Sequence, residues 1–369
     1  MERKYGKVTV VFDGYGNGPS TKDITHLRRK ASAAGGQVNF SKNMLLSSKK
    51  EVFLANESNK QKFIQLLGEL LQMNGCDVKH SRGDADLLIV KSAVAHARDQ
   101  TTLLIGDDTD LLVLLCYHAE PDSHDIYLLP EQKVTSKKQR KVWKIKDVQR
   151  ILGPSICDNI LFGHAFLGCD TTSRVFGVGK GVALKKLKSD SHFMKQAEVF
   201  TKWSTKDEVG TAGEHAMVSL YGGEIGTSLD ELRLLRFREK VSSSTTFVQP
   251  HSLPPTTSAT TQHSLRVYFQ VQLWKDERVS EMIPQDWGWE LRNERLVPVH
   301  TNMPPAPSHL LRVIRCNCKS DCASSRCSCR KHGLDCSPGC GECRGVSCTN
   351  SPQADFEGDA QDVLFNCAD

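Results

Sequence analysis

Residues 101–113 read Thr-Thr-Leu-Leu-Ile-Gly-Asp-Asp-Thr-Asp-Leu-Leu-Val. The first five residues have the length and composition of a β-strand, and the apolar residues 109–117 follow as a second short element. Between the two lie Asp107, Asp108 and Asp110. A strand that ends in acidic residues fits an open α/β sheet, in which sites form at the carboxyl ends of the strands.

The same alternation of short elements extends on both sides of this stretch. Residues 8–12 and 126–129 are strand-like, whereas residues 60–73 carry apolar side chains at helical spacing and residues 86–97 are a second candidate helix. Strands interleaved with helices in this way favour a parallel sheet with helices packed on its faces. We therefore expect an α/β unit over residues 1–190.

Composition divides the rest of the chain. Residues 191–241 indicate a mainly helical extension. Residues 242–264 contain no Asp, Glu, Lys or Arg and are rich in Ser, Thr and Pro, which is typical of a linker between independent modules. The remaining predicted segments are a small tryptophan-containing piece at 265–309, a cysteine module at 310–350 and a disordered acidic tail at 351–369.

The overall composition excludes several classes of protein. The chain has 369 residues, of which 39% are hydrophobic and 25% charged, enough for two or three compact units and too apolar for wholesale disorder. Its longest uninterrupted apolar stretch, residues 111–117, is far shorter than a membrane span. The first residues lack the apolar region of a signal peptide, so we expect neither a membrane protein nor a secreted one. The net charge of +5 does not by itself indicate a polyanionic partner.

Further aspartates occupy places equivalent to those after the 101–105 strand. Asp13 directly follows the first strand, Asp84 and Asp86 open a helix, and Asp170 lies in a Leu-Gly-Cys-Asp sequence. Each alone is explained as a helix cap. Converging carboxylates, however, repel one another by about 4 kcal/mol at 4 Å and an effective dielectric near 20, and therefore require a cation or protonation. Oxygen ligands suit Mg²⁺ or Mn²⁺, which as paired ions promote phosphodiester hydrolysis.

The order of these acids resembles the PIN-like 5′ nuclease superfamily, which includes the flap endonucleases. The resemblance covers residues 7–187 and implies a PIN-like parallel sheet flanked by helices. In that family such acids hold two divalent ions, here Mg²⁺ or Mn²⁺. By resemblance, Asp84 orients the attacking water or a second ion, and the ions are held by Asp13, Asp86, Asp108, Asp110 and Asp170.

A segment rich in glycine and lysine follows Asp170. Residues 176–186 look like a shortened form of the helix–two-turn–helix with which the family grips a duplex backbone. Its glycines let backbone N–H groups approach a phosphate, and Lys180, Lys185 and Lys186 add positive charge. No Ser or Thr follows the Gly-Lys pair, which excludes a P-loop. The segment fits an ordinary loop-to-helix turn equally well.

Nine of the fourteen cysteines crowd into residues 316–348. In a large chain without a signal peptide this density indicates metal rather than disulfides. Six terminal and three bridging thiolates complete the coordination of three tetrahedral Zn²⁺ ions. The nine residues are Cys316, Cys318, Cys322, Cys327, Cys329, Cys336, Cys340, Cys343 and Cys348.

The cysteine spacing resembles the tesmin-like CXC domain, whose members fold around such a cluster and bind DNA. The resemblance implies a small zinc-stapled module at the C-terminal side and a nuclear location. Seven basic residues against three acidic ones between residues 310 and 350 fit nucleic acid better than a knot used for protein contact. The expected contacts are made by Arg315, Arg326, Arg330 and Lys331.

Three functional hypotheses remain. The first is a Mg²⁺- or Mn²⁺-dependent nuclease that hydrolyses phosphodiester bonds and is tethered to DNA by its CXC module. The second is a non-catalytic DNA-binding or chromatin-associated protein whose nuclease-like domain serves as a scaffold. The third makes the first domain a protein-interaction fold and the zinc knot a structural staple. DNA is the expected nucleic acid in the first two.

Overall fold

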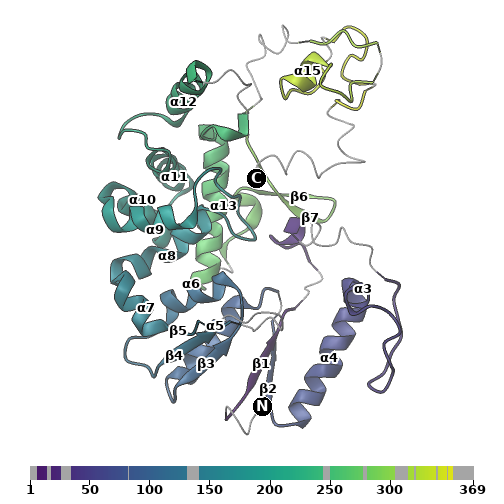
Figure 1. Cartoon of the computed structure of the whole chain (residues 1–369), viewed down its shortest axis with the longest axis vertical. Helices are drawn as coiled ribbons and strands as arrows, with labels where there is room; N and C mark the ends of the chain where they lie inside the picture. Colours follow the sequence, from purple (N-terminus) through teal and green to yellow (C-terminus); the bar gives the residue numbers. More distant parts are fainter. Residues whose placement is uncertain are drawn as a thin grey trace.

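The computed structural model is a mixed α/β protein with a separate small lobe that carries the cysteines (Figure 1). The sheets are small, and helices make up most of the regular structure. The described residues are 6–14, 18–25, 35–81, 83–130, 141–243, 250–276, 281–303, 315–319, 321–337, 340–346 and 348–351. Residues 352–369, for which we expect an acidic disordered tail, lie outside them.

The strands of the α/β unit form two small sheets. β1 (Thr9–Phe12) pairs in parallel with β2 (Asp77–His80). β3 (Thr102–Ile105) pairs in parallel with β4 (Ile126–Leu129), and β5 (Trp143–Lys144) adds an antiparallel edge. The predicted strands therefore form, but the described residues contain two parallel pairs rather than the one continuous parallel sheet that we expected.

Helix α5 (Asp86–Ala97) connects the two sheets through side chains. Thr9 Oγ1 lies 3.0 Å from His96 Nε2, and Lys79 Nζ lies 3.0 Å from Ser92 Oγ. The same helix packs against β3 and β4. The strands are only four residues long, and polar contacts to a shared helix join the β1–β2 pair to the rest of the unit. The β1–β2 pair and the β3–β4 pair both end on the side of the unit where α5 begins. The aspartates of the predicted site lie there.

The helices of the unit follow the expected periodicity. The expected helix at 60–73 is the second part of α4 (Glu57–Met73), which α3 (Lys50–Ala55) precedes. The apolar run at 109–117 is α6 (Thr109–His118). The helices that follow are α7 (Ile145–Leu152), α8 (Pro154–Phe166), α9 (Lys180–Ser189), α10 (Ser191–Thr201), α11 (Lys206–Leu220) and α12 (Leu229–Ser243).

The linker predicted over residues 242–264 is wrong for its second half. Residues 250–252 form the 3₁₀ turn η1 (Pro250–Ser252), and α13 (Thr257–Lys275) begins only a few residues later. α13 runs through the middle of the helical part in Figure 1 and is buried along most of its length. Residues 244–249 lie outside the described part of the chain. α13 therefore spans the boundary at residues 264 and 265 between the predicted linker and the predicted tryptophan-containing segment.

Small side chains explain why a serine- and threonine-rich sequence is buried here. A Cβ atom placed on Gly213 of α11 would lie 2.6 Å from Ser264 Cβ of α13, and one on Gly210 would lie 3.2 Å from Thr261 Cγ2. The two helices thus cross at a distance that only small residues permit. The absence of charge, which suggested a linker, is the mark of a helix surrounded by protein.

The tryptophan-containing segment does not form a separate piece. It contributes the second half of α13, the 3₁₀ turn η3 (Pro284–Asp286) and a hairpin of β6 (Trp289–Arg292) and β7 (Arg295–Pro298). Trp287 stacks on Tyr268 of α13, with ring centroids 4.7 Å apart. The segment belongs to the same hydrophobic core as α8, α10 and α11.

The cysteine lobe contains one short helix among its described residues, α15 (Ser328–Lys331). Its core consists of cysteine side chains. None of the helices in the described part of the chain combines the length and the apolar character needed to cross a membrane.

Candidate functional site

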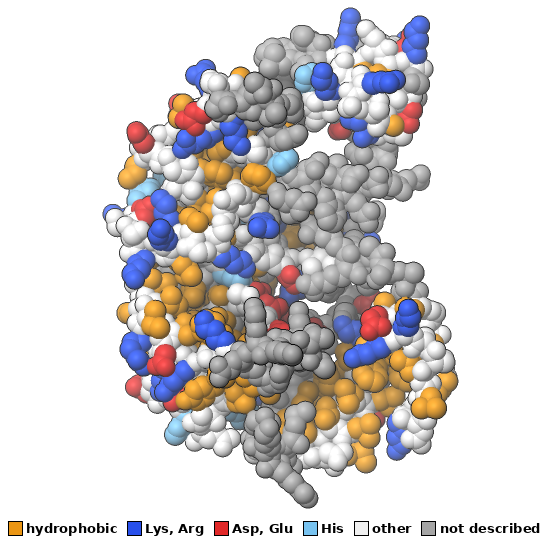
Figure 2. All heavy atoms as spheres, viewed as in Figure 1, with side chains coloured by type: hydrophobic (Ala, Val, Ile, Leu, Met, Phe, Trp, Pro, Cys, Tyr) orange, Lys and Arg blue, Asp and Glu red, His pale blue; other side chains and the backbone are white. Residues whose placement is uncertain are grey.

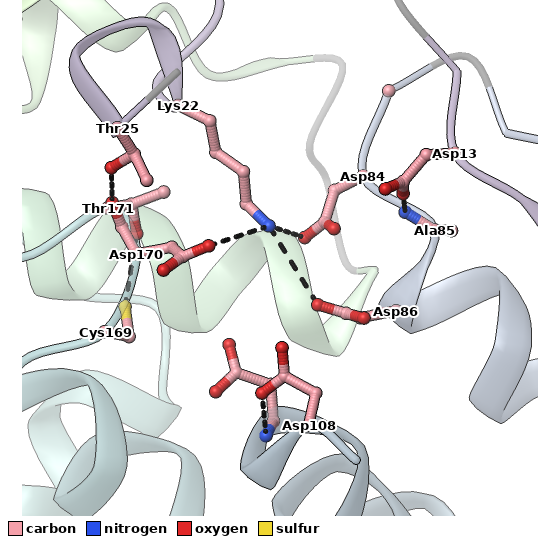
Figure 3. Close-up of polar contacts among 12 residues, drawn as sticks. Asp13, Lys22, Thr25, Asp84, Ala85, Asp86, Asp108, Cys169, Asp170 and Thr171 are labelled. Carbon is pink, nitrogen blue, oxygen red and sulfur yellow. Dashed lines mark hydrogen bonds and ion pairs between the residues drawn. The ribbon is translucent and has the colours of Figure 1, made fainter. Parts of the chain in front are cut away.

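Asp13 fixes the turn that carries two of the other acids. Its Oδ1 atom accepts a hydrogen bond of 3.0 Å from the backbone N–H of Ala85, and Gly14 N donates to Gly83 O over 3.0 Å. This turn leads from β2 into α5. It places the side chains of Asp84 and Asp86 so that they face Asp170 (Figure 3). The carboxylate of Asp13 therefore acts first as a support for its neighbours.

Lys22 lies at the centre of the acidic cluster (Figure 3). Its Nζ atom is 2.8 Å from Asp84 Oδ2, 3.9 Å from Asp86 Oδ2 and 3.8 Å from Asp170 Oδ2. The lysine side chain is 17% exposed and that of Asp86 is 15% exposed, so water screens these charges only in part. Three carboxylates from two distant segments thus share one ammonium group.

The pKa shifts follow from this arrangement. Burial alone would lower the pKa of Lys22, but the carboxylates of Asp84, Asp86 and Asp170 outweigh it and raise that pKa. Burial, together with the carboxylates of Asp84, Asp108 and Asp110, raises the pKa of Asp86 to about 8 although Lys22 opposes the shift. One ammonium group is therefore not enough to neutralise the cluster around Asp86.

The short segment that carries Lys22 is held to the rest of the protein by residues that follow the lysine. Asp23 Oδ2 accepts hydrogen bonds from Ser20 N over 3.0 Å and from Leu296 N over 3.1 Å, the latter on β7. Thr25 Oγ1 donates to the backbone carbonyl of Asp170 over 2.6 Å. The chain thus holds the base of Lys22 beside the acids.

Helix α6 brings two more acids to the same place. Asp108 is its N-cap and accepts a hydrogen bond of 3.0 Å from Asp110 N. In Figure 3 the Asp108 side chain points toward Asp86 and Lys22. The capping role predicted for a single aspartate is therefore real here, and Asp108 is exposed to solvent as well.

His164 of α8 orients Asp110. The two side chains are joined by a bond of 2.7 Å between Nε2 and Oδ1, and the imidazole is almost completely buried. Lys180 Nζ lies 3.1 Å from His164 Nδ1 and 3.2 Å from its Nε2, so the ammonium group contacts the same ring. Burial would raise the pKa of Asp110, but the hydrogen bond to His164 and the charges of His164, Lys180 and Lys22 outweigh it and lower that pKa.

Helix α13 supports the site from behind. Thr171, the neighbour of Asp170, donates a buried hydrogen bond of 2.6 Å to Gln270 Oε1. The ring of His164 packs against Trp274, with centroids 5.7 Å apart. Gln270 and Trp274 belong to the tryptophan-containing segment predicted over 265–309, and this half of α13 is therefore part of the scaffold of the acidic site.

The six predicted aspartates converge in part. Asp84, Asp86 and Asp170 share Lys22, and Asp108 and Asp110 are close enough to Asp86 to shift its pKa. Asp13 bonds to the turn beside them. Figure 2 shows acidic side chains gathered in a hollow near the middle of this face. In the described residues, no group of three or more carboxylates brings its oxygens within 4.8 Å of one another, as some cysteine groups do with their sulfur atoms.

The ammonium group of Lys22 shows that a cation fits among these carboxylates. An ammonium group already contacts three carboxylates, and the oxygen donors available are those that Mg²⁺ and Mn²⁺ prefer. The donor set is therefore chemically suited to a hard cation. A metal at Asp84 and Asp170 would have to share or replace the place of Lys22.

Sequence reasoning missed both Lys22 and His164. Nothing in the residues around Lys22 distinguishes it from a solvated lysine. His164 offered a signal, because it is a polar residue close to Asp170 in the last part of α8, where residues 160–166 are otherwise apolar. A polar group at such a position needs a partner, which is an acid of the site.

The lysines predicted to contact nucleic acid differ in their surroundings. Lys180, the first residue of α9, contacts His164 and so lies next to the acidic site. Lys185 is exposed on the same helix. Lys186 pairs with Asp190 over 3.2 Å. The glycine-rich segment thus leads into a helix whose first lysine is turned toward the aspartates.

The nine cysteines form a compact cluster of sulfur atoms. Cys316 Sγ lies 3.8 Å from the sulfur atoms of Cys322, Cys336 and Cys343. Zn–S bonds of about 2.3 Å give a tetrahedron with edges of about 3.8 Å. The spacing is that of zinc ligands and much longer than a disulfide bond. The clustered cysteines could therefore hold a metal such as zinc.

The metal-binding groups overlap. Three sets of four cysteines each bring their sulfur atoms within 4.8 Å, and Cys316 belongs to all three. Burial raises the pKa of Cys316 to about 12 and that of Cys329 to about 11. These thiols are protonated at neutral pH unless a cation binds them, so metal binding would release protons. The sets are Cys316, Cys327, Cys329 and Cys336; Cys316, Cys322, Cys336 and Cys343; and Cys316, Cys318, Cys322 and Cys327.

The four basic residues expected to contact nucleic acid on this lobe are not equivalent. Arg315, Arg326 and Lys331 are exposed. Arg330 instead donates from Nε to the carbonyl of Cys322 over 2.9 Å and from Nη2 to that of Thr349 over 3.3 Å. Arg330 is exposed too, but it links the backbone at Cys322 to the backbone at Thr349, a structural role that the sequence did not indicate.

Comparisons with models of protein families, with curated proteins and with solved structures find no match to this chain.

Proposed function

We propose that the chain is a divalent-metal-dependent nuclease that hydrolyses phosphodiester bonds and is tethered to nucleic acid, in our proposal DNA, by its cysteine lobe. One observation carries the proposal. Three aspartates from two distant segments gather around one buried ammonium group, and two more aspartates at the start of α6 act on the same carboxylate. Such an excess of negative charge is costly in a fold unless a cation or a proton neutralises it, and we propose a divalent cation as the functional occupant.

The residues suited to hold Mg²⁺ or Mn²⁺ are Asp86, Asp108 and Asp110, with Asp84 and Asp170 on the other side of Asp86. Bound ions of this kind lower the pKa of a water molecule and stabilise the leaving oxygen. His164 keeps Asp110 oriented and deprotonated through the bond of 2.7 Å between them. Asp13 holds the turn of Asp84 and Asp86 by its bond to Ala85 N, which makes it a positioning residue unless it turns inward.

Lys180 is suited to contact a phosphate of the substrate. Its ammonium group lies beside His164 at the start of α9, and glycines precede it. Lys185 is exposed further along the same helix, and we propose that both lysines contact phosphates of a nucleic-acid strand bound at the acids. These contacts position the strand and carry no base specificity.

The cysteine lobe is proposed to bind three Zn²⁺ ions and nucleic acid. Cys322, Cys327 and Cys336 each belong to two of the three groups of four, as bridging thiolates do, and nine ligands need three such bridges to complete three tetrahedral sites. Arg315, Arg326 and Lys331 would contact phosphates or a groove. We place the protein in the nucleus on the basis of this lobe alone.

The test is a nuclease assay on the full chain with Mn²⁺ or Mg²⁺, using single- and double-stranded DNA and RNA. Asp108→Asn combined with Asp110→Asn is expected to lower the rate by about 10³-fold or more, the order of loss when the charged groups that stabilise a transition state are removed. Asp158→Asn, an exposed aspartate on α8, is the matched control and should retain full activity. No cleavage by the wild type, or an unchanged rate in the double variant, would refute the proposal.

A second candidate is a non-catalytic DNA-binding or chromatin-associated protein with a nuclease-like scaffold. The observation in its favour is Lys22, which neutralises part of the acidic cluster without any metal. This candidate predicts zinc-dependent DNA binding without turnover, and no gain of cleavage in Lys22→Met. Cleavage by the wild type would exclude it.

A further inference from the structure

Lys22 is the residue of the acidic site that neither the sequence nor the proposed function explains. Its ammonium group contacts carboxylates of Asp84, Asp86 and Asp170, and its side chain is mostly buried. The neighbouring residues Asp23 and Thr25 bind Leu296 N and the carbonyl of Asp170. Both anchoring residues closely follow Lys22, so the backbone that carries the lysine is fixed next to Asp170.

We propose that Lys22 is the resident cation of one of the two cation positions of the acidic site, so that the folded chain takes one divalent ion at Asp86, Asp108 and Asp110 and a second only when Lys22 leaves Asp84 and Asp170. The inference rests on the proposed function for the existence of a divalent-metal site. The sequence analysis expected two bound divalent ions. We now expect one divalent ion, with the ammonium group of Lys22 in place of the second.

Distance and charge divide the site into two halves. On one half, Lys22 is closest to Asp84, at 2.8 Å, and lies 3.8 Å from Asp170. On the other half, Asp108 is the N-cap of α6 and Asp110 lies in its first turn. Figure 3 shows Asp108 directed toward Asp86. Lys22 is nearest to the first half, so the second half keeps an excess of carboxylates that a divalent ion can neutralise.

A divalent ion and an ammonium group cannot share a position. Each needs the same carboxylate oxygens, and two cations a few ångströms apart repel each other as strongly as the acids do. Binding at Asp84 and Asp170 therefore requires Lys22 to rotate away. Because Asp23 and Thr25 hold the backbone, the ammonium group moves by rotation of its own side chain and stays close to the site.

Removal of the lysine charge is the direct experiment. The full-length, zinc-loaded chain is titrated with Mn²⁺, and free Mn²⁺ is measured by electron paramagnetic resonance. Zinc gives no signal in this measurement. We expect one bound Mn²⁺ in the wild type and two in Lys22→Met. We also expect the affinity of the variant for the first ion to rise about tenfold, the size of effect that one neighbouring charge has on the proton affinity of a carboxylate.

Two further variants control for charge and for general effects. Lys22→Arg keeps the positive charge and should keep the wild-type stoichiometry. Lys79→Met removes a lysine that contacts Ser92 and lies 4.0 Å from Asp77, away from the cluster, and should bind Mn²⁺ as the wild type does. Lys22→Gln replaces Lys22→Met if the latter does not fold.

Thermal unfolding gives a second readout. Without metal, Lys22→Met should melt below the wild type because its carboxylates repel one another, and saturating Mn²⁺ should raise its Tm more than that of the wild type. Equal stoichiometry and affinity in Lys22→Met and the wild type, or two ions in the wild type, would overturn the inference and leave the metal site intact. No Mn²⁺ binding in either protein would overturn the inference together with the metal site of the proposed function.

Discussion

The acidic site and the cysteine cluster are both groups of metal-type ligands, and they are built in opposite ways. All nine cysteines lie within 33 consecutive residues, and their side chains form the core of their own lobe. The aspartates are spread from Asp13 to Asp170 and depend on β1, α5, α6 and a support from α13. The cysteine cluster is therefore its own scaffold, whereas the acidic site is a product of the whole α/β unit.

The largest expected effect is that of metal removal on the cysteine lobe. Chelation should unfold this lobe, because structural zinc supplies on the order of 10 kcal/mol of folding free energy to small domains. The main unfolding transition of the α/β unit should not move. Circular dichroism and calorimetry with and without chelator measure both events. A main transition that shifted with chelation would show that the two regions are coupled.

Single variants sharpen this prediction within the cluster. Cys316 belongs to all three groups of four and Cys318 to one. Cys316→Ser should therefore lose more bound zinc than Cys318→Ser, as measured by metal analysis of the purified chain. Equal losses would contradict the sharing of Cys316.

The pH dependence of stability should belong to the α/β unit. Burial, and to a lesser extent Arg266, lowers the pKa of His263 on α13 from 6.5 to about 4, and His263 lies 2.9 Å from the carbonyl of Phe166. Between these two values the unfolded chain binds a proton that the folded chain does not, so stability falls as the pH falls from about 6.5 to about 4. The loss is on the order of 3 kcal/mol.

His263→Gln removes this proton and provides the comparison. We measure the free energy of unfolding of both proteins by denaturant titration at several pH values. The wild-type value minus the variant value should decrease by on the order of 3 kcal/mol as the pH falls from about 6.5 to about 4. A difference that stayed constant with pH would contradict a neutral, buried His263.

A smaller effect is expected from the contact between α11 and α13. Gly213→Ala places a methyl group against Ser264 and should destabilise the α/β unit by about 2 kcal/mol, while leaving the zinc content of the cysteine lobe unchanged. Gly181→Ala is the matched control on α9, because a Cβ atom there meets nothing within 4 Å and alanine is the better helix former. Chemical denaturation measures both, and equal effects would argue against close packing of α13.

The smallest effect separates two arginines of the cysteine lobe. Arg326→Ala should weaken DNA binding uniformly across sequences and reduce the salt slope by about one phosphate contact. Arg330→Ala should instead destabilise the zinc-loaded lobe by about 1 kcal/mol through the lost bonds to Cys322 and Thr349. Fluorescence anisotropy at several salt concentrations and thermal unfolding of the lobe distinguish the two. Loss of binding without loss of stability in Arg330→Ala would reverse the assignment.

Local pattern predicted many of the elements. The strands β1, β3 and β4 and the start of α5 at Asp86 lie where the apolar runs and the acids placed them. These elements are specified by neighbours in the sequence, so a short window contains the needed information. The predicted PIN-like and CXC relationships remain proposals.

Helix α13 shows why the rest was not predictable. It is buried on nearly all sides, so it has no alternation of polar and apolar faces to reveal it. Some of its polar residues bind distant partners: Gln270 accepts a hydrogen bond from Thr171, and Arg266 donates to the carbonyl of Gly288 over 3.1 Å. No property of residues 257–275 alone reports those partners.

By itself the sequence determined the short strands, the positions of the aspartates at element ends and the cysteine spacing, because each depends on residues that are close along the chain. The tertiary structure alone decided that Lys22 neutralises Asp84, Asp86 and Asp170 and that His164 orients Asp110. Such contacts join residues tens to more than a hundred positions apart. Which charges meet is set by the packing of the intervening helices, and a linear pattern contains no record of that packing.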